Sequence, residues 1–266
     1  MSAARWSSVA ELAASVPDGA SIATGGFMLG RAPIRLVLEL VAQEKRGLHL
    51  LSLPNPLPAE LLVAGGCLAS VQLAFGALTL QGRVRAMPAL KRAMERGSVA
   101  WQEHDGYRVV QRLRAAAMGL PFLPAPDADV SALAQQDPPF SVDHPVSGER
   151  VPVELAFSPD VALLHARAAD ARGNLYIEDP TTDLLVAGAA RRVLATVEQR
   201  VERLERVTVP GFQVEQVALA PGGALPTGCA GLYPHDDDAL ARYLASAEAG
   251  DAAAALAELL SHRRAA

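Results

Sequence analysis

Short apolar runs alternate with longer stretches of helical periodicity along most of the chain. A short apolar run bounded by Gly, Pro or Asn is typical of a buried strand, and a longer amphipathic stretch is typical of a helix that covers it. The pattern predicts strands at 21–24, 48–53, 70–75, 99–102, 161–165 and 193–198, and helices at 9–16, from 33 to near 47, and at 60–64, 87–96, 107–119 and 183–192. This alternation predicts an α/β fold, an open, doubly wound, mainly parallel sheet with helices on both faces.

The stretch from about 125 to 160 interrupts this alternation. It is rich in Pro, Asp and Ser and shows little periodicity, so it is expected to be a long irregular excursion with a hairpin around Ser147-Gly148. No tandem repeat or low-complexity linker divides the rest of the chain. The prediction is therefore a single domain over residues 1–266 that contains this excursion.

Composition narrows the class of protein. The chain has 24 Lys+Arg against 29 Asp+Glu and no basic block, so nucleic acid is not an expected partner. Its two cysteines, Cys67 and Cys229, make neither a disulfide framework nor a CxxC pair, and its six histidines are not spaced for zinc. Residues 1–16 lack the apolar core of a signal peptide or membrane span. These features predict a cytoplasmic enzyme component with no bound metal and no membrane contact.

The stretch from Asp18 to Pro33 carries the most specific pattern. Asp18-Gly19 is a turn pair, a short strand follows, Gly25-Gly26 can take positive φ, and Pro33 fits the first turn of a helix. Adjacent glycines let backbone N–H groups approach a ligand beside the positive end of a helix dipole. A thioester carbonyl or a carboxylate would suit that place, and a tight turn without a ligand is the alternative.

Further candidates follow other predicted strands. Ligands of a doubly wound sheet bind beyond the carboxyl ends of its strands. The residues expected to line a pocket there are Ser52, Asn55, Phe75 and Gly76, and the pair Gly222-Gly223 could present backbone donors. Each of these is equally well explained as an ordinary loop or turn residue.

The Asp18–Pro33 string resembles the signature of the α subunit of class I coenzyme A transferases. That signature has an aspartate-glycine pair, an apolar run, Gly-Gly-Phe, and then glycine and proline at fixed spacing. The matching residues here are Asp18, Gly19, Gly25, Gly26, Phe27, Gly30 and Pro33, with Thr24 where the family usually has an aliphatic residue. Later segments resemble glutaconate-type α subunits, among them Leu-Pro-Phe-Leu-Pro at 120–124 and the Gly-Asn turn at 173–174, so the resemblance runs from Asp18 to about Leu244.

Glu103, His104 and Asp105 end the strand at 99–102 and would allow acid-base chemistry or form a solvated turn. In a ring-cleaving hydrolase branch of the family, the glutamate that matches Glu103 is regarded as catalytic. The resemblance therefore implies a catalytic role for Glu103 and none for His104 or Asp105. It also implies that the loop with Gly25, Gly26 and Phe27 contacts substrate.

The resemblance implies the α subunit of a heteromeric, glutaconate CoA-transferase-like enzyme, expected as an α2β2 assembly that acts on a glutaconyl-type acyl-CoA. Coenzyme A would be part of the substrate, with no bound cofactor, and the nucleophilic glutamate would belong to the β subunit. CoA transfer between carboxylic acids is the main prediction. The alternatives are cofactor-free decarboxylation of 3-methylglutaconyl-CoA in isovaleryl-CoA biosynthesis, known from a myxobacterial branch, C–C hydrolysis, and a non-enzymatic ligand-binding regulator.

Overall fold

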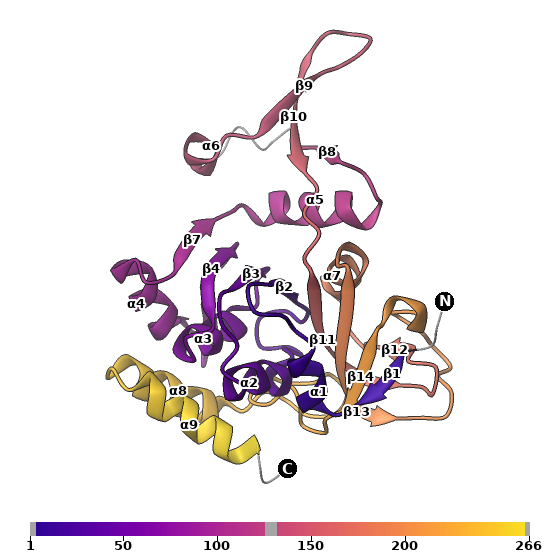
Figure 1. Cartoon of the computed structure of the whole chain (residues 1–266). Helices are drawn as coiled ribbons and strands as arrows, with labels where there is room; N and C mark the ends of the chain where they lie inside the picture. Colours follow the sequence, from indigo (N-terminus) through magenta and orange to yellow (C-terminus); the bar gives the residue numbers. More distant parts are fainter. Residues whose placement is uncertain (1–3, 126–131, 264–266) are drawn as a thin grey trace.

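The structure is a computed structural model that describes residues 4–125 and 132–263. The strands of its largest sheet are β1 (Arg5–Ser7), β2 (Ser21–Thr24), β3 (Leu48–Ser52), β4 (Leu68–Leu73), β7 (Ala100–Glu103), β11 (Val161–Ala169), β12 (Leu175–Tyr176), β13 (Arg192–Arg200) and β14 (Gln216–Leu219). They follow the order β1-β14-β13-β11-β2-β3-β4-β7, and every neighbouring pair in this order is parallel (Figure 1). Only the short β12, among the described strands of this sheet, pairs antiparallel, with β11.

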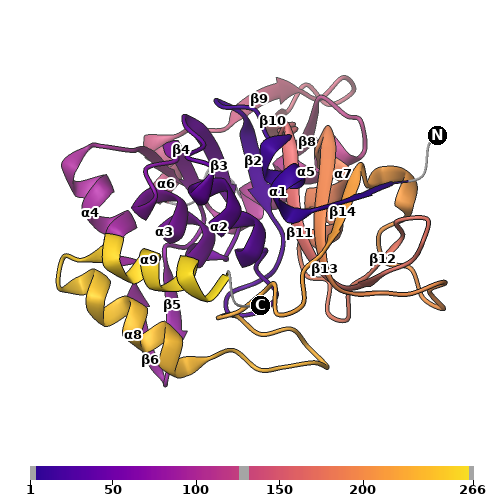
Figure 2. The same ribbon diagram turned by 60° about the horizontal axis from the view of Figure 1, so that its bottom comes forward.

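Alternate residues of the central strands face two different hydrophobic cores. Ile22 and Leu50 belong to the first core, whereas Ala23 and Leu51 belong to the second. The first core is covered by α1 (Val9–Ala14), α2 (Ile34–Ala42), α3 (Pro56–Ala64), α4 (Pro88–Arg96), α8 (Asp237–Glu248) and α9 (Ala252–Arg263), and the second by α5 (Gly106–Ala117) and α7 (Asp183–Ala189). Figure 2 shows α8 and α9 as the outermost helices of the first layer. The predicted doubly wound α/β class is confirmed.

Helix α3 begins earlier than the sequence predicts. It starts at Pro56 rather than at Glu60, because prolines are tolerated in the first turn, where backbone N–H groups have no helical acceptor. Glu60 is fully buried and accepts the N–H groups of Ala89 (2.9 Å) and Leu90 (2.8 Å) at the start of α4. Burial raises the pKa of Glu60, and these hydrogen bonds oppose the shift. The carboxylate thereby joins α3 to α4.

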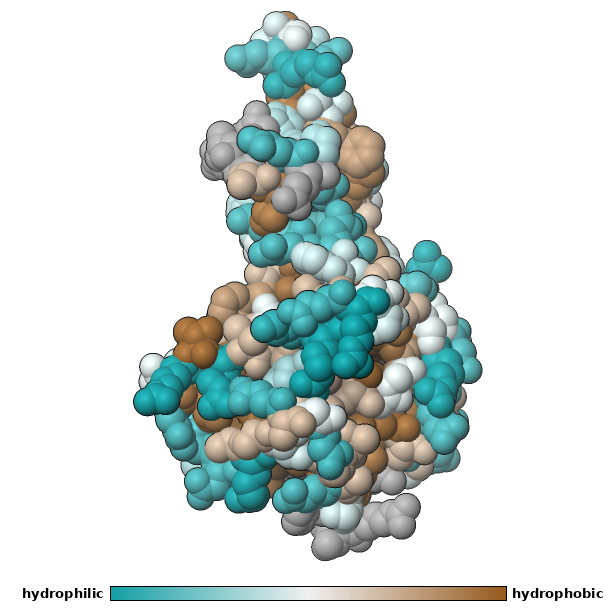
Figure 3. Space-filling view, turned by 90° about the vertical axis from the view of Figure 1, so that its left-hand side faces the viewer, coloured by the Kyte–Doolittle hydropathy of each residue, from teal (hydrophilic) through white to brown (hydrophobic). Residues whose placement is uncertain are grey.

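The excursion is a small antiparallel sheet rather than an irregular segment. Strands β8 (Phe122–Pro124), β9 (Phe140–Asp143) and β10 (Arg150–Leu155) pair in the order β8-β10-β9, and α6 (Ala132–Gln136) precedes β9. The hairpin predicted around Ser147-Gly148 is confirmed, whereas residues 126–131 of the excursion lie outside the described residues. We call this sheet the arm. It stands out from the body above α5, as a narrow column (Figures 1 and 3).

The remaining described elements are short. They are the hairpin of β5 (Ala77–Leu80) and β6 (Arg83–Ala86) and the 3-10 turn η1 (Gly211–Gln213). Across residues 4–125 and 132–263, no helix has the length and apolar character that a membrane span requires.

Candidate active site

The parallel strands place their carboxyl ends along one edge of the sheet, which we call the carboxyl edge. The predicted site residues follow five of these strand ends: Gly25, Gly26 and Phe27 after β2, Ser52 and Asn55 at the end of β3, Phe75 and Gly76 after β4, Glu103 at the end of β7, and Gly222 and Gly223 after β14. The structure joins the first two groups directly, because Asn55 Nδ2 donates to the Gly25 carbonyl at 2.6 Å.

The backbone N–H groups of the glycine turn are already bonded within the chain. Gly25 donates to a carbonyl of β11 at 2.9 Å, Gly26 donates to Asp183 Oδ1 at 3.0 Å, and Phe27 donates to the Gly30 carbonyl at 2.9 Å. The expectation of free donors aimed at a ligand is therefore corrected. Contact between this loop and substrate stays a prediction, and the exposed part of the loop is the side chain of Phe27.

A buried ion pair explains the two glycines. Arg31, only 1 % exposed, donates from Nη1 and Nη2 to the two carboxylate oxygens of Asp183, each at 2.9 Å, and from Nε to Asp179 at 2.9 Å. A Cβ on Gly25 would lie 2.4 Å from Asp183 Oδ1. Gly26 has φ +85°, and a Cβ there would lie 2.6 Å from a backbone carbonyl oxygen. Packing and backbone conformation thus require glycine at both positions.

Ser52 and Asn55 hold the loop after β3 in shape. Ser52 Oγ donates to the carbonyls of Leu53 (2.9 Å) and Asn55 (3.0 Å), and both Ser52 and Asn55 are buried. The expectation that they line an open pocket is therefore corrected for this chain. Asn55 Oδ1 is buried without a hydrogen-bond partner among the described residues, so this amide has unused acceptor capacity.

The loop after β14 packs on a buried polar cluster. The Gly222 N–H donates to Glu198 Oε2 at 2.6 Å, while Glu198 Oε1 lies 2.7 Å from His165 Nε2 and accepts the hydroxyl of Tyr233. Burial opposes the charge of Glu198, but the hydrogen bonds from His165 and Tyr233 outweigh it and lower the pKa. A Cβ on Gly223 would lie 2.7 Å from His165 Cε1. Both glycines therefore have structural contacts.

The same cluster contains the one group of potential metal ligands found among the described residues. The ligand atoms of His165, Glu198 and Cys229 all lie within 4.8 Å of one another. Both carboxylate oxygens of Glu198 already accept hydrogen bonds, and burial raises the pKa of the Cys229 thiol to about 11. A protonated thiol and an occupied carboxylate do not fit a metal ion.

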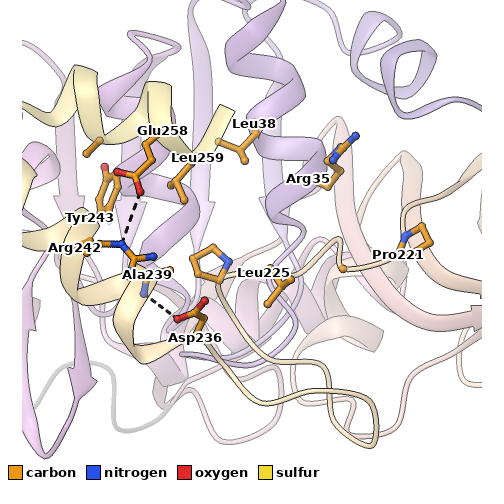
Figure 4. Close-up of a pocket in the computed structure, with 13 residues that line it drawn as sticks. Arg35, Leu38, Pro221, Leu225, Asp236, Ala239, Arg242, Tyr243, Glu258 and Leu259 are labelled. Carbon is orange, nitrogen blue, oxygen red and sulfur yellow. Dashed lines mark hydrogen bonds and ion pairs between the residues drawn. The ribbon is translucent and has the colours of Figure 1, made fainter. Parts of the chain in front are cut away.

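Two of the predicted residues line cavities. Gly222 lines one of about 260 Å³ between α2, the loop 221–226 and the pair α8 and α9, where Arg242 and Glu258 lie 3.7 Å apart (Figure 4). Gly76 lines another of about 370 Å³, together with Leu73, Trp101 and side chains of α4. The two cavities share no lining residue, so the predicted residues do not converge on a single pocket of this chain.

Glu103 and His104 lie on opposite faces of the sheet. Glu103 is in register with Leu73 of β4, and side chains alternate along a strand, so Glu103 is on the Leu73 face and exposed. His104 is buried on the other face, with Nε2 3.2 Å from Gln72 Oε1. Asp105 is the N-cap of α5 and accepts the N–H of the second helical residue at 2.8 Å. Asp105 thus has a structural role, and a catalytic role for Glu103 stays a prediction.

The model of the family described as coenzyme A transferase matches residues 7–220. This match spans most of the chain. The chain belongs to the coenzyme A transferase family. The resemblance of its glycine-rich string to that family is confirmed.

Known relatives of this coenzyme A transferase family chain include a component of glutaconate CoA-transferase. The A-type subunit of that enzyme from Acidaminococcus fermentans is 28% identical over 256 residues, covering 87% of this chain and 79% of that protein. The crystal structure of the enzyme from the same organism superposes with a TM-score of 0.83 at 25% identity, covering 92% of this chain and 84% of the other. An uncharacterized protein of Archaeoglobus fulgidus is 31% identical over 86% of this chain, which spans about half (53%) of that relative.

A further solved structure is much more similar. It is a crystal structure of a variant of the decarboxylase AibA/AibB, with a TM-score of 0.96 and 73% sequence identity, covering 98% of this chain and all of the matched chain.

Sequence reasoning missed several polar residues of this family member. They are Arg31, Asp183, Glu198, Tyr233 and, under the arm, Arg112. One signal was available. His165 and Glu198 end or interrupt otherwise apolar strands, and a charged or titratable residue in such a place is seldom buried without a partner.

Thr24, the departure from the family pattern, is expected to tolerate valine. Its Oγ1 is buried without a partner among the described residues, so Thr24→Val removes an unsatisfied hydroxyl. We expect a gain of about 1 kcal/mol and a Tm about 2–4 °C higher, with activity retained. The matched control is Thr196→Val, because Thr196 Oγ1 lies 2.8 Å from His165 Nδ1 and its loss should lower Tm. A lower Tm for Thr24→Val would contradict the prediction.

His104 is expected to make stability depend on pH. Burial lowers the pKa of His104 from 6.5 to about 4, Arg112 adds to the shift, Asp137 opposes it, and Arg108 lowers the pKa further. The unfolded chain therefore binds more protons between pH 6.5 and 4, and the free energy of unfolding should fall by up to about 3 kcal/mol as pH drops through this window. His104→Gln should flatten the dependence of Tm on pH there. An equally steep dependence in the variant would rule out His104 as its source.

Proposed function

We propose that this chain is the α subunit of a decarboxylase that acts on a glutaconyl-type acyl-CoA, with 3-methylglutaconyl-CoA as its substrate. The observation that carries the proposal is the 73% identity, over 98% of this chain, to a chain of the AibA/AibB decarboxylase. The matched chain of glutaconate CoA-transferase is only 28% identical. The decarboxylase alternative is therefore preferred to CoA transfer as the reaction of this chain.

The proposed substrate allows decarboxylation by its own electronic structure. The bond between the free carboxylate and the γ-carbon breaks, CO₂ leaves, and the electron pair is delocalised through the double bond into the thioester carbonyl. A proton then adds to the γ-carbon and gives 3-methylcrotonyl-CoA. The protein has to hold the thioester, orient the carboxylate so that its C–C bond is aligned with the π system, and supply that proton.

We propose that a β subunit covers the carboxyl edge and completes the site, in an α2β2 assembly. Large exposed apolar side chains follow strand ends or begin helices at this edge: Phe27 (42%), Phe75 (40%), Tyr107 (45%), Leu184 (49%), Leu219 (51%) and Leu225 (46%). Apolar side chains gathered along one edge suit a protein interface. Several relatives are themselves named as one lettered component of a transferase, which supports the existence of such a partner.

Co-expression with the β subunit tests the proposal. The purified complex is incubated with 3-methylglutaconyl-CoA, and CO₂ release and transfer of CoA to acetate are followed separately. We expect CO₂ and 3-methylcrotonyl-CoA from the complex, and an inactive, aggregation-prone preparation from the chain alone. Transfer of CoA without CO₂ release would favour the transferase reaction, and a soluble, fully active single chain would exclude the role of a β subunit.

A further inference from the structure

Arg112 is a half-buried arginine whose contacts are all with neutral groups. It lies on α5, where Nη1 donates to Gln72 Oε1 at 3.0 Å and lies 3.3 Å from His104 Nε2. Its guanidinium stacks over the ring of Phe157, 5.3 Å from the ring centroid. Among the described residues, no carboxylate forms an ion pair with it.

The other buried arginines are neutralised. Arg31 is paired with Asp183 and Asp179. Arg108, one helical turn before Arg112, is paired with Glu154 and with Asp137 at 3.4 Å. Burial lowers the pKa of Arg112, and the attraction of Glu154 and Asp137 offsets it only in part. Arg112 is thus a partly desolvated cation that lacks its anion.

The neutral contacts hold the guanidinium in one orientation. A guanidinium only donates, so His104 Nε2 accepts from Arg112, and the ring proton is assigned to Nδ1. Both hydrogen bonds leave from Nη1. The edge formed by Nε and Nη2, which can grip a carboxylate with two parallel hydrogen bonds, has no partner among the described residues.

This cation lies at the carboxyl edge. Gln72 is near the end of β4, and His104 directly follows β7. The half-buried surface of Arg112 is therefore beside the strand ends where ligands of this sheet type bind. Glu103 is on the other face of β7, so it is not the missing anion.

We infer that Arg112 binds the free carboxylate of a dicarboxylic acyl-CoA and selects such substrates over monocarboxylic ones. The inference rests on the proposed function for the class of substrate. Gln72, His104 and Phe157 are positioning residues for the guanidinium. Because the carboxylate is fully charged before the C–C bond breaks, Arg112 acts on substrate binding more than on the chemical step.

Binding of two matched acyl-CoA compounds to the α–β complex tests this inference. Glutaconyl-CoA carries the free carboxylate, and crotonyl-CoA is the same acyl chain without it. We expect Arg112→Gln to weaken the Kd for glutaconyl-CoA about 10- to 100-fold, and to change the Kd for crotonyl-CoA less than about twofold. With 3-methylglutaconyl-CoA, KM should rise while kcat changes little, and Arg112→Lys should restore part of the affinity.

Arg114→Gln is the matched control, because Arg114 is exposed on the same helix and donates to Gln111 Oε1 at 2.6 Å. It should bind both compounds as the wild type does. If the wild type prefers glutaconyl-CoA and Arg112→Gln keeps that preference, or loses both compounds equally, Arg112 does not recognise the carboxylate. If the wild type itself shows no preference, the substrate class of the proposed function is wrong as well.

Discussion

Replacing Asp183 by asparagine is expected to destabilise the protein by about 3–5 kcal/mol, because it leaves Arg31 buried beside a neutral amide. Asp183 accepts from Nη1 and Nη2 of Arg31 and from the N–H of Gly26, so the change weakens an ion pair and the glycine turn together. We expect the Tm of the α–β complex to fall by about 10 °C, or the yield of soluble complex to collapse.

Asp179→Asn is the matched control for this prediction. Asp179 also binds Arg31, at 2.9 Å, but its side chain is 55% exposed. Water can replace that carboxylate, so the change should cost about 1 kcal/mol or less. Equal losses of Tm in Asp179→Asn and Asp183→Asn would show that burial of the ion pair does not determine its contribution.

The strands that the sequence reveals are those buried on both faces. β2, β3 and β11 lie in the middle of the sheet, and their largely apolar runs follow directly from that position. β1 and the hairpin β5-β6 have mixed or exposed patterns and are short, so periodicity does not reveal them. The arm is not revealed for the same reason, since many of its strand residues face solvent.

The candidate site could be predicted by place but not by contact. The glycine turn is located correctly after β2, yet the N–H of Gly26 bonds to an aspartate 157 positions later in the chain. Nothing in the local pattern indicates that Gly25 and Asp183 touch. Arg112 is a similar case, because whether a helical arginine is paired depends on Gln72, His104 and Phe157, which only the tertiary fold brings together.

Glu103→Gln is expected to lower the turnover of the α–β complex by about 10²–10⁴-fold, the usual effect of removing a positioned acid-base group. Glu103 ends β7 at the carboxyl edge, on an exposed face that the proposed β subunit would cover. Its carboxyl group could deliver the proton that the γ-carbon needs after CO₂ has left. The substitution keeps the size of the side chain and removes the group that titrates.

Single-turnover rates with 3-methylglutaconyl-CoA across pH measure this effect. If Glu103 transfers the proton, Glu103→Gln should lose the limb of the pH profile that reports a carboxyl group, while the Tm of the complex and the Kd for crotonyl-CoA stay unchanged. Glu149→Gln is the matched control, since Glu149 is an exposed carboxylate in the hairpin of the arm, and its rate should equal that of the wild type. A wild-type rate in Glu103→Gln would make Glu103 a solvated strand-end residue, and the proton would then have to come from the β subunit or from water.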